Sequence, residues 1–413
     1  MQRIQRLNFL HVNVSCCGML LPLTTVVLAA CRRADVDALW QLYEATGGAK
    51  WVHHHNWSPT GDPCGLSSQW SGVGAIDPCD TWLDGERCYF GRVTSIYLDS
   101  NRLNGSLSDW TQIGELSNLT YLDLSWNSLT GAIPTELGLI NNLQTLLVAH
   151  NEVSGTLPAE LGSISALAAP DAPRLRELSF ANNRLSGSLP SSLGTHTELL
   201  SLDLRSNALT GGGIPTELAA LGRLASWHMQ DNLQLGGTLP AALGGLSELR
   251  FLDLSRTGLS GTLPSSLQMP LLQALHVAAN RLSGSIPDAI TGLGMLRTLR
   301  LADNLLVGNL PSAIGMLSRL QVLDVYNNSM DGDVPASVRD LLELKELYLA
   351  HEHLKPLRKR YCGQRLPNLG KYSYRVVREE YDRMMASYCP EDEMRSTEST
   401  FGRLQDSLPP DEL

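Results

Sequence analysis

A hydrophobic pattern recurs about every 24 residues through the middle of the chain. Residues 119–134 and 175–190 both follow L-x-x-L-x-L-x-x-N-x-L-x-G-x-[IL]-P, with Phe180 at one apolar position. Nine units carry asparagine at the fixed position, and Thr257 and Glu352 take that position in two further units. The spacing widens to 32 between Asn151 and Asn183, where residues 166–174 form an Ala/Pro-rich insertion. The pattern therefore predicts eleven repeats.

Each repeat predicts one turn of a solenoid. Alternation places Leu122 and Leu124 in the core, while Tyr121, Asp123 and Ser125 point outward from a short parallel strand. After the strand, a buried amide side chain is expected to satisfy backbone donors and acceptors as the chain turns inward. The predicted asparagine ladder comprises Asn101, Asn127, Asn151, Asn183, Asn207, Asn232, Asn280, Asn304 and Asn328.

The glycine and proline of each repeat set a return path on the convex side, and no repeat buries its leucines alone. The expected fold class is therefore an α/β repeat solenoid: a right-handed leucine-rich-repeat superhelix with short parallel strands on its concave side. Such a solenoid needs a cover at both ends.

These repeats resemble the plant-type extracellular leucine-rich repeats of receptor-kinase ectodomains and polygalacturonase-inhibiting proteins, over about residues 35–354. The Trp- and Cys-containing segment before them resembles the family's N-terminal cap, a short helix followed by Trp-rich loops, and that resemblance implies a disulfide between Cys79 and Cys88. The segment departs from the pattern at residues 70–75, where Ala75 stands at an expected cysteine. Cys64 therefore has no clear local partner, and Cys31 is a candidate only if it survives cleavage.

The ends of the chain predict secretion. Arg3 and Arg6 precede an apolar stretch over residues 12–30, which is typical of a signal peptide; Ser15 and Pro22 make a retained membrane anchor the weaker interpretation. Residues 28–31 also fit a bacterial lipoprotein cleavage box. The C-terminal Pro-Asp-Glu-Leu resembles an ER-retention signal, although Pro410 replaces its basic or histidine residue. The expected localisation is extracellular, with the ER lumen as the alternative and no membrane span after removal of the leader.

The expected domain organisation has five parts: a signal peptide (1–30), an N-terminal Trp/Cys cap (31–92), the repeats (93–354), a C-terminal helical cap (355–390) and a disordered acidic tail (391–413). Cys362 and Cys389 bracket an amphipathic segment and are expected to form a disulfide. If the chain is lumenal, four sequons become candidates for N-glycosylation: Asn56, Asn104, Asn118 and Asn327.

Composition and motifs bear mainly on what is excluded. A formal net charge of -10 disfavours nucleic-acid binding. The sequence has no phosphate-binding loop, nucleophile elbow, zinc-protease helix or C-x-x-C pair, so we expect no enzyme activity, cofactor or metal. The run His53–His55 is interpreted as an exposed cap loop because adjacent histidines rarely converge on one ion.

The concave face is the predicted binding surface because its outward side chains are not needed for the fold. Mixed charge and clustered aromatic residues favour a protein or peptide partner. The candidate residues are Tyr97, Tyr121, Asp123, Trp126, His150, Arg205, His228, Arg256, Arg300, Tyr326 and Tyr348.

Three functions fit these observations. The first is a secreted, non-catalytic recognition module in signalling or defence, which would need a membrane co-receptor to signal. The second is a structural, wall-associated glycoprotein that acts as a spacer. The third is an enzyme that pairs His228 with Asp203 or Asp253, and no sequence motif supports it. A glycan on Asn327 would shift the binding surface toward residues 97–150.

Overall fold

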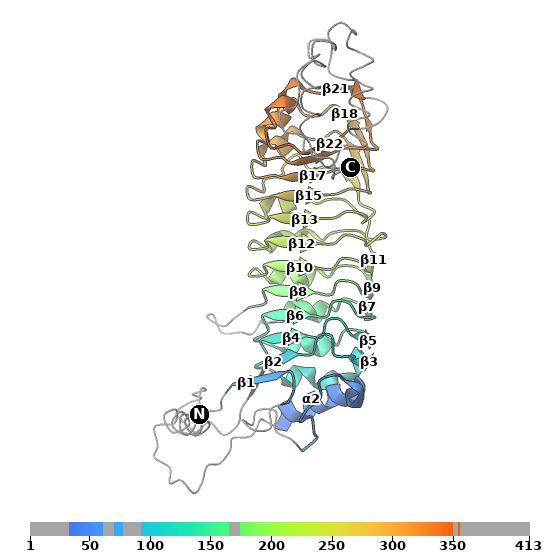
Figure 1. Ribbon diagram of the computed structural model, residues 1–413, viewed down its shortest axis with the longest axis vertical. Helices are drawn as coiled ribbons and strands as arrows, with labels where there is room; N and C mark the ends of the chain where they lie inside the picture. Colours follow the sequence, from blue (N-terminus) through green and yellow to red (C-terminus); the bar gives the residue numbers. More distant parts are fainter. Residues whose placement is uncertain (1–32, 61–69, 77–91, 165–173, 350–353, 356–413) are drawn as a thin grey trace, which may run out of the picture. The chain divides into compact units, whose positions relative to one another are not determined.

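The computed structural model describes residues 33–60, 70–76, 92–164, 174–349 and 354–355. The chain divides into two compact units, residues 1–207 and 208–413, and each is described by itself. Both units are built from stacked leucine-rich turns, which confirms the predicted solenoid fold (Figure 1).

The main sheet of the first unit contains one strand from each repeat. The antiparallel pair β1 (Val73–Ile76) and β2 (Arg92–Tyr97) begins it, and parallel strands then follow in sequence order: β4 (Tyr121–Asp123), β6 (Thr145–Leu147), β8 (Glu177–Ser179) and β10 (Ser201–Asp203). The central residue of each three-residue strand is buried, and the residues on either side point outward. We call the outward side of this sheet the strand face.

The return path of the first unit contains elements that the repeat pattern did not predict. Short parallel ladders pair β3 (Asn104–Ser106) with β5 (Ser128–Thr130), and β7 (Ser154–Thr156) with β9 (Arg184–Gly187). They are followed by 3-10 turns: η3 (Leu107–Asp109), η4 (Thr111–Glu115), η5 (Thr135–Leu139), η6 (Ala159–Ser163) and η7 (Ser191–Thr195).

Glycine lets these 3-10 turns stack closely. A Cβ atom at Gly138 would collide with the carbonyl oxygen of Glu160 in the next turn, and one at Gly162 would collide with Ser192 in the turn after that. The recurring Leu-Gly pair therefore places a leucine in the core and keeps the adjoining position free for the neighbouring backbone.

The asparagine position of each repeat carries the side chains that join one repeat to the next. Asn127 Nδ2 donates to the carbonyl oxygens of Leu98, Leu124 and Ser125, and its Oδ1 accepts from the backbone N–H groups of Asn101 and Leu103. Asn151 repeats this arrangement one turn later. These bonds satisfy backbone groups that the inward turn would leave without partners.

Helix α2 (Arg33–Ala45) covers the open end of the first unit's core, and η1 (Gly48–Lys50) follows it. Asp35 is fully buried; its Oδ2 accepts from Arg92 Nε at 3.2 Å and from the N–H of Val93 at 3.0 Å. Trp110 Nε1 donates to the carbonyl oxygen of Ala38 at 2.8 Å. These bonds attach the helix to the first repeat.

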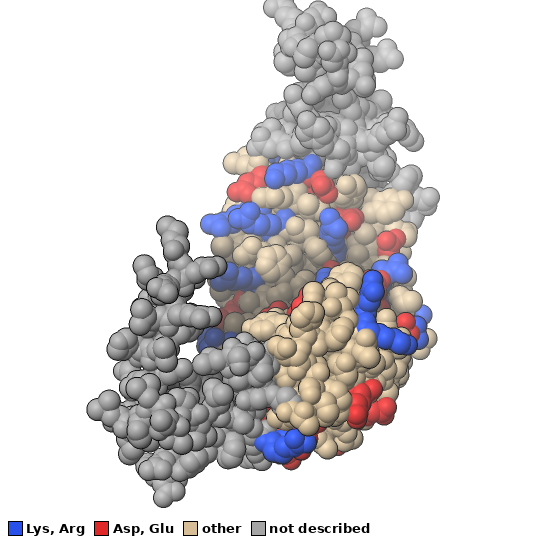
Figure 2. Space-filling model, turned by 60° about the horizontal axis from the view of Figure 1, so that its bottom comes forward, with Lys and Arg blue, Asp and Glu red and all other residues tan. Residues whose placement is uncertain are grey.

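Aromatic rings fill the space beside this helix. Tyr43 stacks on Trp40 and Trp57, with ring centroids 4.6 and 5.7 Å apart, and Trp57 also contacts Trp51 and Trp70. The Trp-rich segment of the sequence thus forms one packed cluster. Seen from this end of the molecule, the described surface is mostly uncharged, with its Lys, Arg, Asp and Glu side chains in small groups (Figure 2).

The second unit repeats the same turn. Its main parallel strands are β12 (Ser226–His228), β13 (Phe251–Asp253), β15 (Ala274–His276), β17 (Thr298–Arg300), β19 (Val322–Asp324) and β22 (Glu346–Tyr348). Its return path carries β11 (Ala208–Leu209), η8 (Thr216–Ala220), η9 (Ala241–Gly245), β14 (Ser260–Thr262), β16 (Arg281–Gly284), η10 (Asp288–Gly292), β18 (Leu305–Gly308), η11 (Ile314–Met316), β20 (Ser329–Met330), β21 (Gly332–Asp333), η12 (Ala336–Asp340) and β23 (Leu354–Lys355).

The strands β2 to β10 and β12 to β22 of the main sheet supply one strand for each of the eleven predicted repeats. Thr257 takes the asparagine position in one of them, where its Oγ1 donates to the carbonyl oxygen of Leu254 at 2.6 Å. Glu352 lies outside the described residues, as do the predicted leader, all six cysteines from Cys31 onward, the C-terminal cap after Lys355, and the tail. Within the described ranges, no helix is both long and apolar enough to cross a membrane.

Candidate binding surface

Two tyrosines from neighbouring strands form the first part of an exposed aromatic patch in the first unit. Tyr97 ends β2 and Tyr121 begins β4, and their rings stack with centroids 4.7 Å apart. They meet diagonally because Tyr97 lies opposite Asp123 in the strand register, and Tyr121 lies opposite Ser95. Tyr97 remains 51% exposed, so this stacked pair still offers an aromatic surface to a partner.

Trp126 and His150 form the second part of the patch, and they occupy a turn rather than a strand. Both have left-handed backbone angles, with φ of 59° and 56°. Each directly precedes a ladder asparagine, so the two side chains lie one repeat apart and stack with ring centroids 3.5 Å apart. Trp126 is 61% exposed. We define the aromatic patch as Tyr97, Tyr121, Trp126 and His150.

The left-handed turn recurs throughout both units, and it contradicts the expectation that Ser125 points outward. Ser125 does not point outward; it is buried because the chain turns inward directly after Leu124, and its N–H bonds to Asp123 Oδ1 at 2.9 Å. The residues that take the left-handed position are Ser100, Trp126, His150, Asn182, Ser206, Asp231, Arg256, Ala279, Asp303 and Asn327.

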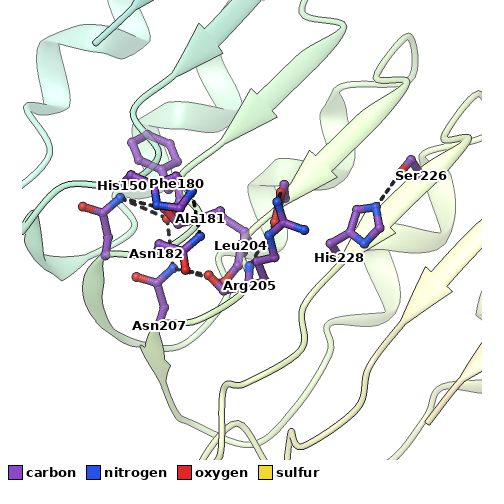
Figure 3. A network of polar contacts seen from close by, with 11 residues as sticks. His150, Phe180, Ala181, Asn182, Leu204, Arg205, Asn207, Ser226 and His228 are labelled. Atoms are coloured by element: carbon purple, nitrogen blue, oxygen red, sulfur yellow. Dashed lines mark hydrogen bonds and ion pairs between the residues drawn. The ribbon is translucent and has the colours of Figure 1, made fainter. Parts of the chain in front are cut away.

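Polar neighbours hold the ring of His150 in place. The Nδ2 atom of Asn182 lies 3.3 Å from His150 Nε2, as Figure 3 shows. Partial burial lowers the pKa of His150, and the nearby positive charge of Arg205 lowers it further. The imidazole is therefore held toward its neutral form.

Acidic side chains lie near the tyrosine pair of the aromatic patch. Burial raises the pKa of the Tyr121 hydroxyl, and the negative charges of Asp123, Glu177 and Asp99 add to that rise. Tyr121 therefore stays a neutral hydrogen-bond donor. Arg205 lies further along, where its guanidinium is 3.3 Å from Asp203 Oδ2.

The predicted residues of the second unit take part in separate polar pairs. His228 Nε2 lies 2.8 Å from Ser226 Oγ, as Figure 3 shows, and Arg256 Nε lies 2.6 Å from Asp231 Oδ1. Arg300 and Tyr326 are exposed, and Tyr348 is half-buried with its hydroxyl 3.4 Å from Glu346 Oε2.

Histidines and carboxylates alternate across the sheet of the second unit, where His228 lies opposite Asp253 and Asp253 lies opposite His276. Asp253 Oδ2 is 3.5 Å from His276 Nδ1. Burial by itself would raise the pKa of Asp253, but the bonds from His276 and Ser255 outweigh burial and lower it. Burial raises the pKa of Asp324. Among the described residues, no three His, Cys, Asp or Glu side chains are grouped so as to hold a metal ion.

The predicted sequons differ in accessibility. Asn56 and Asn104 are exposed, whereas Asn118 is half-buried. Asn327 is exposed, but its Nδ2 donates to Asp303 Oδ1 at 2.8 Å. Both residues line a shallow depression of about 540 Å³ in the second unit, together with Asn280, Arg281, Asn304, Leu305, Asn328 and Ser329.

Comparisons with known proteins place these repeats among known relatives. The family model described as Leucine Rich Repeat matches residues 118–139, 174–196 and 248–269. An inactive leucine-rich repeat receptor-like serine/threonine-protein kinase of Arabidopsis thaliana is 30% identical over 123 residues, which is 30% of this chain and 16% of that protein.

Solved structures extend the likeness over more of the chain. The ectodomain of the Arabidopsis receptor kinase HAESA, solved with a peptide hormone, matches with a TM-score of 0.61 and 28% identity over 78% of this chain and 50% of that chain. A TDR receptor matches with a TM-score of 0.51 and 28% identity over 62% of this chain and 47% of that chain. The chain thus spans about half the length of these ectodomains.

A third solved structure shares the fold alone. A plant ice-binding protein matches over 79% of this chain and 87% of its own, with a TM-score of 0.54 and 22% identity. The repeat pattern, the matched family model and the similarity to the HAESA ectodomain all indicate leucine-rich repeats. The chain contains leucine-rich repeats, and these are similar to the repeats of plant receptor-kinase ectodomains.

Proposed function

We propose that this chain is a secreted or lumenal recognition module that binds a peptide or protein segment through the aromatic patch on its first unit. The observation that carries the proposal is the exposure of stacked aromatic rings, Tyr97 with Tyr121 and Trp126 with His150, on a face that the core does not use. Exposed, clustered aromatic residues are typical anchors of protein interfaces.

The rigidity of the patch supports binding. Tyr97 and Tyr121 belong to strands, and Trp126 and His150 lie in turns, each directly before a ladder asparagine. Both pairs stack in the absence of a partner. Little conformational entropy of these side chains would therefore be lost on binding. Structurally similar ectodomains include that of HAESA, which was solved with a peptide hormone.

The location of the module follows from the N-terminal sequence. The predicted signal peptide would deliver the chain to the secretory pathway, where Asn56 and Asn104 present exposed sequons. A module of this kind has no catalytic role, and signalling would require a membrane-bound partner. HAESA has been solved with the co-receptor SERK1 as well as its peptide hormone, which is the model for such a step.

Affinity capture from the native extracellular or lumenal fraction tests the proposal. The mature protein is compared with a Tyr121→Ala/Trp126→Ala double variant, after circular dichroism has shown that both are folded. We expect a partner that the mature protein retains and the double variant loses.

A matched control is Leu139→Ala, which removes an equally exposed apolar side chain from η5. We expect it to retain the partner. Equal capture by the double variant, or no capture by any form, would contradict the proposed surface and favour the structural spacer glycoprotein.

A further inference from the structure

We propose that the aromatic patch recognises a Lys or Arg side chain in an extended, cationic peptide segment of the partner. This inference rests on the proposed function and names the chemistry of the ligand. It combines two features of the first unit: exposed aromatic rings, and acidic side chains gathered around them.

The aromatic rings supply faces for a cation. The tyrosine pair stacks with its planes 30° apart, and the indole and imidazole lie 10° from parallel. In each pair, stacking covers one face of a ring and leaves Tyr97 and Trp126 largely exposed. An ammonium or guanidinium group is attracted to the face of tyrosine and most strongly to that of tryptophan.

The charges around the rings select the sign of the ligand. In the strand register Asp123 lies opposite Tyr97, and Thr145 lies between Tyr121 and Glu177. The charges of these two carboxylates and of Asp99 all act on the Tyr121 hydroxyl. Asp99 and Glu177 are exposed, and their carboxylates make no hydrogen bond or ion pair with any residue in the described ranges. They are therefore available to a cationic partner.

Within the strands themselves no positive group faces these carboxylates, although the exposed Arg176 directly precedes Glu177 at the start of β8. Within β2, β4, β6 and β8 the one Lys or Arg is Arg92, which is directed into the cap, where it binds Asp35 and the Oγ atom of Ser117. Arg205 follows β10 and is paired with Asp203. At the tyrosine pair an anionic peptide would therefore be repelled, and a cationic one would be attracted.

Peptide display on the full chain tests the inference without knowledge of the natural ligand. A random library of extended peptides is selected on the wild-type protein, and the Lys and Arg content of the bound peptides is compared with that of the input. A selected peptide is then measured by fluorescence polarisation, beside a version with each Lys and Arg replaced by Gln. We expect enrichment of Lys or Arg, and at least tenfold weaker binding by the neutral version.

Protein variants locate the binding. Asp99→Asn/Asp123→Asn is expected to weaken the selected peptide about tenfold at low salt, and added salt should weaken wild-type binding because it screens exposed charges. The matched control Asp109→Asn removes an exposed carboxylate from η3 and should leave the affinity unchanged.

The outcomes separate this inference from the proposed function. If the selected peptides require Tyr121 and Trp126 but are not enriched in Lys or Arg, the inference of a cationic ligand is wrong. The proposed binding surface would still stand. Failure to select any peptide, or selection of peptides that bind the Tyr121→Ala/Trp126→Ala variant equally well, would overturn both. If the chain instead associates with itself, and this requires both the patch and the Lys/Arg-rich residues 355–360, the patch binds a second copy of the chain. That result would contradict the inference of an external partner.

Discussion

Adjacent residues in the turn after each strand have opposite tasks. Asn151 points into the molecule and bonds to backbone groups of two repeats, while His150, directly before it, points outward and stacks on Trp126. The left-handed conformation at His150 makes this division possible because it separates the directions of the two side chains. One turn thus supplies both fold stability and a binding side chain.

Asn151→Ala should strongly destabilise the first unit. The buried amide donates to the carbonyl oxygen of Leu124 at 3.0 Å and accepts from the N–H of Leu129 at 2.9 Å. Leaving two buried backbone groups without partners is expected to cost about 2–4 kcal/mol of unfolding free energy. Urea denaturation measures it. Asn142→Ala, which removes one bond to the Ser117 carbonyl, serves as the control and should cost less.

His196 gives a pH-dependent prediction. It occupies a core position that holds Ile140 and Ile164 in the preceding repeats, and it is 6% exposed with Nε2 2.9 Å from the carbonyl oxygen of Leu161. Burial lowers the pKa of His196, although the bond to Leu161 opposes the shift. The unfolded chain, with a histidine pKa near 6.5, therefore binds the proton first as pH falls.

The contribution of His196 to stability is therefore fully present above about pH 6.5 and is lost as pH falls toward its lower folded pKa. We expect wild-type stability to drop between pH 7 and pH 5.5 relative to His196→Leu, which carries no titrating group. Denaturation curves at both pH values check this. An unchanged difference between the two proteins would show that His196 titrates alike in the folded and unfolded states.

At the scale of elements, a buried carboxyl group helps to attach helix α2 to the first repeat. Asp35 receives bonds from Arg92 and Val93, and its Oδ1 atom has no partner in the described part of the chain. One attachment of the helix is thus a side chain that is fully buried from water. Its removal should loosen the cap and expose the leucine core at this end.

Asp35→Ala is expected to lower the unfolding free energy by about 3 kcal/mol, because it leaves Arg92 and the Val93 N–H without their shared acceptor. Asp37→Ala is the control on the same helix. Its ion pair with Arg33 is exposed, so we expect a change below about 1 kcal/mol. Thermal denaturation followed by circular dichroism compares the two; equal effects would contradict the role given to Asp35.

Sequence reasoning succeeded where one residue type must occupy one environment. The alternating leucines predicted the parallel strands, and the resemblance to a known cap predicted a helix at the N-terminal end, which α2 provides. It missed the left-handed position before the asparagine because residues as different as Ser100, Trp126 and Arg256 occupy it. It also missed the 3-10 turns, because their Leu-Gly pairs do not show the spacing of hydrophobic residues that predicts a helix.

The candidate site was harder to predict than the fold. Repeat spacing predicted that Tyr97 and Tyr121 lie on one face, but not that they stack diagonally, which depends on strand register. The contact of Trp126 with His150 depends on two left-handed turns one repeat apart. Likewise, the bond from Arg92 to Asp35 joins residues far apart in sequence, and neither belongs to a motif.

At the scale of the whole molecule, the core is a sum of contacts between neighbouring turns. Leu146 is fully buried at the centre of β6, between β4 and β8. Such a core has no single centre, so damage to one turn should act mainly on its neighbours. Local stability is thus expected to differ along the chain.

Leu146→Ala should cost about 2–5 kcal/mol locally, because it leaves a cavity in a fully packed layer. Hydrogen exchange followed by mass spectrometry is expected to show reduced protection in β4, β6 and β8, and little change in strands several repeats away. A uniform loss of protection in all described strands would indicate that the solenoid unfolds as one cooperative body instead.

Photo-crosslinking tests most directly the central claim that the strand face of the first unit binds a partner. A benzoylphenylalanine is placed at Leu147, which is half-buried on β6, or at Thr156, which is exposed on β7 in the return path. Irradiation in the native extracellular or lumenal fraction should give a crosslinked partner from position 147 and none from 156. A partner crosslinked from 156 alone, or equally from both positions, would contradict the account.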